Sequence, residues 1–122
     1  MIEVNRLNPR VVSHLPAEYR RAGSDQWRPC TLHDVSASGA AVLTEVGVPL
    51  KAFLSLRFSI PAQGEGEPAQ VLVECLAVRT ILRPDLDPGR PHFLGVIFLD
   101  LHGAAYEHVR RYVWERLAED ER

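Results

Sequence analysis

The sequence contains no long apolar run. No stretch of about 18 apolar residues occurs anywhere in the 122 residues, so no segment is typical of a membrane-spanning helix. Charged side chains at Glu3, Arg6 and Arg10 interrupt the apolar core that a signal peptide would need. We therefore expect a cytoplasmic protein that does not insert into a membrane.

Cysteine is scarce, and no cluster of metal-ligand residue types is present. Cys30 and Cys75 have no partners at metal-ligand spacing, which favours two buried, reduced thiols over a disulfide or a reactive thiol. His102 and His108 do not share a helical face, and no HxxxH motif occurs. We expect neither a metal site nor a cofactor.

A strong excess of one charge is also absent. The chain has 14 basic and 16 acidic residues, giving a net charge of −2, and aromatic residues make up 7%. Polymeric nucleic acid usually selects a basic surface, and single strands select one interleaved with aromatic rings, so neither ligand is expected. Lys51 is the only lysine, and all other basic residues are arginines. The planar guanidinium group of arginine can donate paired hydrogen bonds to phosphates and to guanine edges.

The composition is that of one globular domain. Hydrophobic residues make up 46% and charged residues 25% of the chain, both near the average for soluble proteins. A chain of this length buries roughly two thirds of its unfolded surface in a single core. We expect one domain over residues 1–122, with a flexible arm at 1–10, a sheet at 11–100 and a helix at 103–118.

Period-two alternation and turn signals predict a mainly-β chain. In Leu54–Ile60 the even positions are large and apolar and the odd positions polar, as in a strand with one buried face. Pro16 indicates an edge or a bulge in the first strand. Six strands are expected, in a barrel or sandwich: Val11–Tyr19, Trp27–Val35, Ala40–Thr44, Leu54–Ile60, Gln70–Leu82 and His92–Leu99.

The period changes after Gly103. Tyr106, Val109, Val113 and Leu117 follow at spacings of three, four and four, which predicts one apolar stripe of a helix that covers the sheet. Tyr112 and Trp114 lie off this stripe. We interpret both as packing on the rim of the sheet, with a partner-binding surface as the alternative.

Two short motifs carry the functional signal. Arg6-Leu7-Asn8-Pro9-Arg10 is an RxxxR motif just before the first strand, and Asp34-Val35-Ser36-Ala37-Ser38-Gly39 is a DxSxxG motif between the second and third strands. Either motif alone is weak. Together, in this order and in a six-strand-plus-helix chain, they resemble the PilZ domain family over essentially the whole sequence. The resemblance implies an all-β fold, a six-stranded antiparallel β-barrel with a C-terminal helix, and binding of the second messenger cyclic di-GMP.

The resemblance also implies which residues contact the ligand: Arg6, Arg10, Asp34, Ser36 and Gly39. An arginine fork can donate two parallel hydrogen bonds to a phosphate or to guanine O6 and N7. Asp34 accepts from guanine N–H groups or holds the turn, Ser36 contacts the ligand or the loop, and Gly39 supplies close backbone approach or a positive φ. The alternatives are a solvated N-terminal segment and a purely structural turn.

Catalysis is not expected. His33, Asp34 and Ser36 could suggest a Ser-His-Asp triad, but neighbouring residues of a strand face opposite sides, so His33 would point away from the other two. We predict no catalytic residue and no enzymatic activity. His92, at the start of a late strand, either reaches a ligand phosphate or is an ordinary surface residue.

The resemblance thus implies a cytoplasmic bacterial receptor that relays cyclic di-GMP binding to an unidentified effector protein. In the PilZ family such effectors belong to motility, pilus or exopolysaccharide machinery. The alternative is a PilZ-like adaptor that acts by protein contact without nucleotide. Asn5 stands where some relatives have an additional arginine, so both a single ligand and an intercalated pair stay open.

Overall fold

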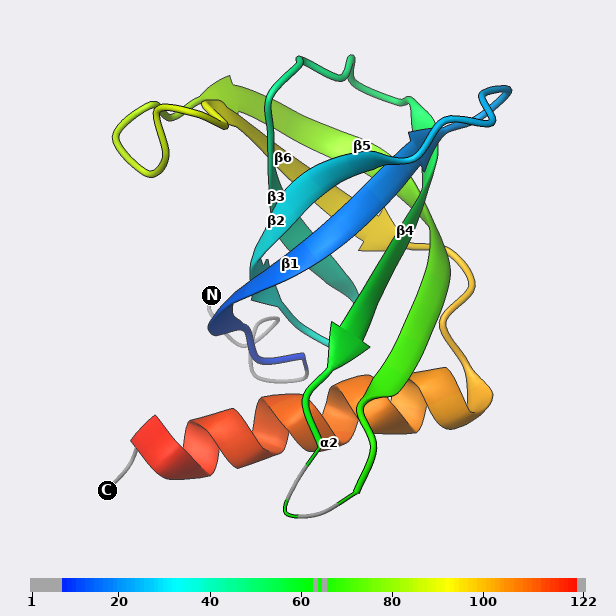
Figure 1. The fold of residues 1–122 in the computed structure, drawn as a ribbon, viewed down its shortest axis with the longest axis vertical. Coiled ribbons are helices and arrows are strands. Elements are labelled where there is room, and N and C mark those ends of the chain that lie inside the picture. Colours follow the sequence, from blue (N-terminus) through cyan, green and yellow to red (C-terminus); the bar gives the residue numbers. More distant parts are fainter. Residues whose placement is uncertain (1–7, 63, 65, 121–122) are drawn as a thin grey trace.

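The structure, a computed structural model, describes residues 8–62, 64 and 66–120. All six expected strands and the expected helix are present, and they form a mostly β fold with one C-terminal helix (Figure 1). The elements are β1 (Val11–Arg21), β2 (Arg28–Val35), β3 (Gly39–Thr44), β4 (Phe53–Ile60), β5 (Ala69–Leu82), β6 (His92–Phe98) and α2 (Gly103–Asp120).

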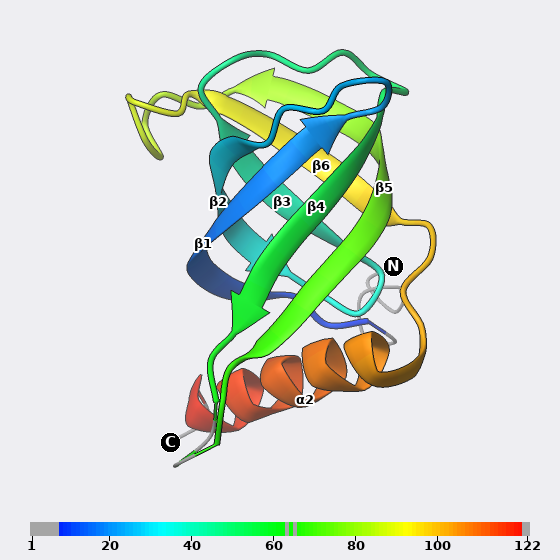
Figure 2. The same ribbon diagram turned by 45° about the vertical axis from the view of Figure 1, so that its right-hand side comes forward.

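The strands close into a barrel with the order β1-β2-β3-β6-β5-β4, and every neighbouring pair is antiparallel. The barrel consists of two three-stranded meanders, β1-β2-β3 and β4-β5-β6, joined by the β3–β6 and β1–β4 pairs (Figures 1 and 2). The prediction of a six-stranded antiparallel β-barrel is therefore confirmed, and closure removes the open sheet edges that a sandwich would leave.

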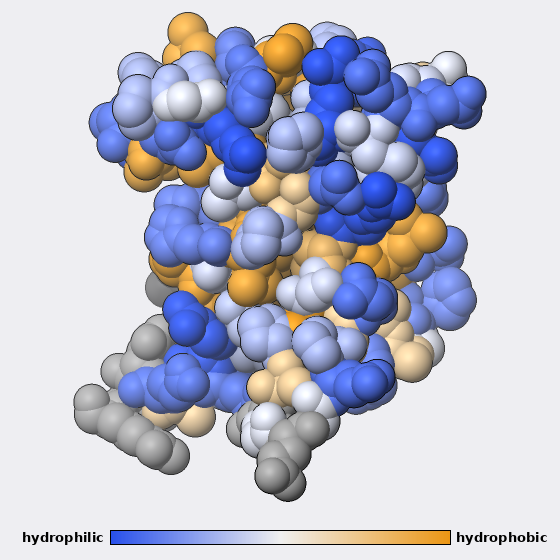
Figure 3. All heavy atoms as spheres, viewed as in Figure 1, coloured by the Kyte–Doolittle hydropathy of each residue, from blue (hydrophilic) through white to orange (hydrophobic). Residues whose placement is uncertain are grey.

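Inward-facing apolar side chains fill the barrel. In β4 the predicted core positions Leu54, Leu56, Phe58 and Ile60 are all buried, but Ser55 on the face expected to be wet is buried as well. Strand β3 differs, because all of its residues are buried and not only every second one. Hydrophilic and hydrophobic residues are intermixed on the face of the molecule that Figure 3 shows.

Two bulges interrupt the first strands. The β1–β2 register shifts between Val12 and Leu15, where His14 has a φ of 50°, and the β2–β3 register shifts between Leu32 and Asp34. Pairing of β1 with β4 begins only at Ala17, so Pro16, which has no amide hydrogen, stands outside that ladder. The bulges lie at the end of the barrel where the two sequence motifs meet.

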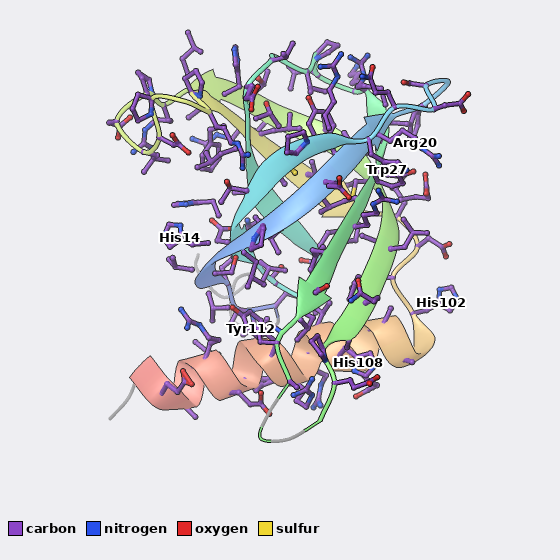
Figure 4. The ribbon with its side chains drawn as sticks, in the orientation of Figure 1. His14, Arg20, Trp27, His102, His108 and Tyr112 are labelled. Atoms are coloured by element: carbon purple, nitrogen blue, oxygen red, sulfur yellow. The ribbon has the colours of Figure 1, made fainter. Side chains whose placement is uncertain are left out.

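Helix α2 covers that same end of the barrel (Figure 2). Val109, Tyr112 and Val113 are buried against the barrel core, and Tyr112 lies on the side of the helix that faces the strands (Figure 4). Arg116 ties the helix to β1, because its Nη2 donates a hydrogen bond of 2.7 Å to the Val12 carbonyl. Among the described residues no helix is long and apolar enough to cross a membrane.

The expectation that Trp114 packs on the rim of the sheet is wrong. Its side chain is 51% exposed, although Tyr112 and Val113 beside it are buried. Each residue of a helix turns about 100° from the one before it, and this rotation carries Trp114 off the face that meets the barrel.

Both cysteines lie inside the barrel as free thiols, as the sequence indicates. Burial raises the pKa of the Cys30 thiol and of the Cys75 thiol to about 12. The nucleophilic thiolate is therefore rare at neutral pH, which favours a packing role for both side chains.

We expect Leu56→Ala to lower the free energy of unfolding by about 2–5 kcal/mol, because it leaves a cavity in the barrel core. Leu72→Ala is the matched control: Leu56 is fully buried, whereas Leu72 on the neighbouring strand is 62% exposed, and its change should stay within about 0.5 kcal/mol. Urea unfolding of both variants measures the difference. Equal losses would contradict this assignment of the core.

Candidate functional site

An ion pair joins the two sequence motifs. Arg10, directly before β1, donates a hydrogen bond of 2.8 Å from Nη1 to Oδ1 of Asp34 near the end of β2. The same oxygen accepts a bond of 3.1 Å from the backbone N–H of Ala41 on β3, which holds the carboxylate in place. The Arg10 side chain is 51% exposed and that of Asp34 18% exposed, so the pair stands at the surface with the carboxylate partly sheltered.

The rest of the DxSxxG motif builds the turn behind Asp34. Ser36 is 1% exposed, and its Oγ accepts hydrogen bonds from the backbone N–H groups of Ser38 and Gly39 at 3.1 and 3.2 Å. A side chain at Gly39 would overlap the carbonyl oxygen of Val96, because β3 and β6 pass very close together there. Gly39 has no positive φ, and the close approach that it permits here is between two strands, so its role toward a ligand stays a prediction.

Beside the ion pair lies a pocket of about 290 Å³ on the outer face of β2, β3, β6 and β5. Arg10 and Asp34 form one side of it, whereas Ser36 and Gly39 do not line it. Arg6, the other arginine of the RxxxR motif, and Asn5 lie outside the described residues. The remaining lining residues include Ala41, Arg79, Phe93, Gly95 and Ile97.

The expectation that His33 faces away from Asp34 is wrong. Its ring lies 6.1 Å from that of Phe93, which lines the same pocket as Asp34, and 5.0 Å from that of His14. The bulge between Leu32 and Asp34 breaks the alternation, so the two neighbours lie on the same outer side of the barrel. What argues against a catalytic triad is therefore the Ser36 hydroxyl, which is buried and engaged in its own turn.

Sequence reasoning missed Arg79, Phe93 and Gly95. One signal was available, because a glycine inside an apolar strand often marks the close approach of a ligand or of another chain segment. His92, which the sequence offered as a possible phosphate contact, lies elsewhere: its ring sits against Gly47, and it does not line the pocket. Within the described ranges no group of three metal-ligating side chains is close enough to hold a metal ion.

The chain is thus a β-barrel domain: a closed six-stranded antiparallel barrel with a helix across one end and an Arg–Asp pair that links two motifs. The sequence profile of the PilZ domain matches residues 5–115. The chain therefore belongs to the PilZ domain family, as its motifs predict. No curated protein shows significant sequence similarity to it.

Several solved structures share this fold. The Bacillus subtilis inhibitor of motility (MotI/DgrA) matches with a TM-score of 0.81 and 14% identity over 94% of this chain, which spans about half (52%) of the longer protein. The PilZ domain of Escherichia coli YcgR with c-di-GMP matches with a TM-score of 0.66 and 13% sequence identity, over 93% of this chain and 92% of that one. The PilZ domain of CeSA from a cellulose-synthesizing bacterium matches with a TM-score of 0.59 and 18% sequence identity, over 87% of this chain and 95% of that one. At these identities the likeness shows the fold alone.

Replacing the buried hydroxyl of the turn should destabilise the domain. We expect Ser36→Ala to lower the free energy of unfolding by about 1–3 kcal/mol, because two backbone N–H groups lose their acceptor. Ser59→Ala on β4 is the control, since no hydrogen bond of the Ser59 side chain occurs within the described part of the chain. Chemical denaturation measures the free energy of unfolding of both variants. An unchanged value for Ser36→Ala would show that the hydroxyl does not hold the turn.

Proposed function

We propose that this chain is a receptor for the second messenger cyclic di-GMP and that it passes the ligand-bound state to a partner protein. One observation carries the proposal: the Arg10–Asp34 ion pair brings the RxxxR and DxSxxG motifs together at the edge of a surface pocket in a PilZ domain. In this proposal Arg6, Arg10, Asp34, Ser36 and Gly39 form the ligand site.

The chemistry of the ligand matches the charges at this pocket. Cyclic di-GMP carries two phosphodiester charges and two guanines, each with O6 and N7 as paired acceptors. Arg10 donates a hydrogen bond to Asp34 from one Nη atom, and its side chain is half-exposed. The other N–H groups of its guanidinium therefore remain for a phosphate or a guanine edge. Asp34 both orients that fork and offers an acceptor to guanine N–H groups.

Ser36 and Gly39 act on the ligand through the turn. The Ser36 hydroxyl and the absent side chain of Gly39 fix the path of the backbone from β2 to β3, and this path places Asp34 at the pocket. Arg6 supplies a second guanidinium from the N-terminal segment. The site is thus a clamp in which one side is the arginine segment and the other is a rigid turn.

The similar structures support this function and suggest its setting. The YcgR domain is described with c-di-GMP, MotI/DgrA is an inhibitor of motility, and the CeSA domain comes from a cellulose-synthesizing bacterium. We place this chain in the control of motility, pili or exopolysaccharide, acting in the bacterial cytoplasm through an effector protein. The proposal includes no enzymatic activity, no polymeric nucleic acid and no membrane insertion.

Loss of either partner of the ion pair should weaken binding. One charge-assisted clamp contributes roughly 1.5–3 kcal/mol, so Arg10→Ala and Asp34→Ala should each reduce cyclic di-GMP affinity by about 10- to 150-fold, and Arg6→Ala should do the same. Calorimetric titration measures this, with GTP and cyclic di-AMP as ligand controls. Arg57→Ala is the matched protein control, because Arg57 forms an equally short ion pair with Glu18 but does not line the pocket.

Two results would count against the proposal. If the wild-type protein gives no heat and no thermal stabilisation with about 100 micromolar cyclic di-GMP, the chain is an adaptor that acts by protein contact alone. If the wild type binds but the substitutions leave the affinity within about threefold, the ligand occupies another surface.

A further inference from the structure

One row of paired residues crosses the floor of the pocket. Asp34 on β2 pairs with Ala41 on β3, Ala41 pairs with Gly95 on β6, and Gly95 pairs with Arg79 on β5. All four residues line the pocket. Three strand spacings of about 4.8 Å separate the backbones of Asp34 and Arg79 by roughly 14 Å. The negatively charged Asp34 and the positively charged Arg79 therefore stand at opposite ends of one row.

The middle of this row is a nearly bare floor with apolar walls. Ala41 contributes only a methyl group and Gly95 no side chain at all. Phe93 and Ile97 lie two positions to either side of Gly95 on β6, so they share its face, and both line the pocket. A flat surface between an aromatic and an aliphatic side chain suits a planar ring, which gains contact area there at little entropic cost.

Arg79 lies at the far edge of this floor, beside Phe93. The register shifts between Ala77 and Arg79, and the Arg79 guanidinium carbon lies 5.8 Å from the centre of the Phe93 ring. A Cβ at Gly95 would come within 3.2 Å of the Arg79 Cβ, so glycine permits the close approach. No ion pair of Arg79 occurs among the described residues, whereas Arg10, Arg57, Arg83 and Arg90 each have one.

The far end of the row offers an acceptor. Both hydrogen bonds that the described residues donate to Asp34 go to Oδ1, which leaves Oδ2 available. A guanine base has the complementary pattern, since its N1–H and N2–H groups are donors and its O6 and N7 are acceptors. Adenine carries an amino donor where guanine has O6, and this donor would oppose the Arg79 guanidinium.

We propose that Arg79 is the guanine-reading residue of this site: a guanine lies on the Ala41–Gly95 floor, donates to Asp34 and accepts from the Arg79 guanidinium through O6 and N7. This inference rests on the proposed function and deepens it, because it names the base that the pocket selects and the residue that selects it. Phe93 supports the guanidinium in its reading position.

Titration calorimetry with cyclic di-GMP, cyclic GMP–AMP and cyclic di-AMP tests this assignment on the full-length wild type, Arg79→Ala, Arg79→Lys and the control Arg57→Ala. We expect Arg79→Ala to weaken cyclic di-GMP binding by about 10- to 150-fold and to reduce the preference for cyclic di-GMP over cyclic di-AMP. Arg79→Lys should not restore the preference, because a point charge cannot engage O6 and N7 together. Arg57→Ala should match the wild type.

The outcomes separate the two proposals. If the wild type binds none of the three dinucleotides, the receptor function fails and the role of Arg79 fails with it. If the wild type binds and Arg79→Ala keeps both affinity and preference, the receptor function stands and the assignment of Arg79 is overturned. If Arg79→Ala weakens the binding of all three dinucleotides equally, the assignment of Arg79 is also overturned, because equal weakening indicates a phosphate contact. Arg79→Gln, with a similar length and no charge, replaces Arg79→Ala if the latter fails to fold.

Discussion

The pairing of β3 with β6 is the contact on which the rest of the structure depends. Together with the β1–β4 pair it joins the two meanders and closes the barrel, and it brings Gly39 so near to Val96 that no side chain fits between them. The same pairing sets Ala41 beside Gly95 and so creates the floor of the pocket. The glycine of the DxSxxG motif therefore serves barrel closure first, and the ligand site is built on the closed barrel.

Local pattern predicted the elements well because the forces behind them are local. Alternation in Leu54–Ile60 and the stripe from Tyr106 to Leu117 each report which face of one element is buried. The apolar positions of Leu54–Ile60 are buried, and so are Val109 and Val113 at the centre of the stripe, whereas Tyr106 and Leu117 at its ends are only partly buried. The two motifs could also be found from the sequence, and the structure brings Arg10 and Asp34 into contact. The roles of the motif residues toward a ligand stay predictions.

The other side of the pocket could not be predicted, since it depends on strand order. Arg79 and Phe93 meet Asp34 only because β3 is followed in the barrel by β6 and then β5, and no local signal encodes that order. The bulge at His33 is a second example. It reverses the expected direction of one side chain through a register shift with β3, and such a shift arises from pairing between strands.

Closure by β3 and β6 also has a kinetic consequence. The whole β4–β5 hairpin lies between these two strands in the sequence, so the chain must close a long loop before they can pair. Barrels dominated by such distant pairings fold slowly, in milliseconds to seconds, compared with helical bundles. Because the pocket straddles the β3–β6 seam, it exists only once that seam has formed. A nascent or partly folded chain can therefore carry both motifs and still have no place for a ligand.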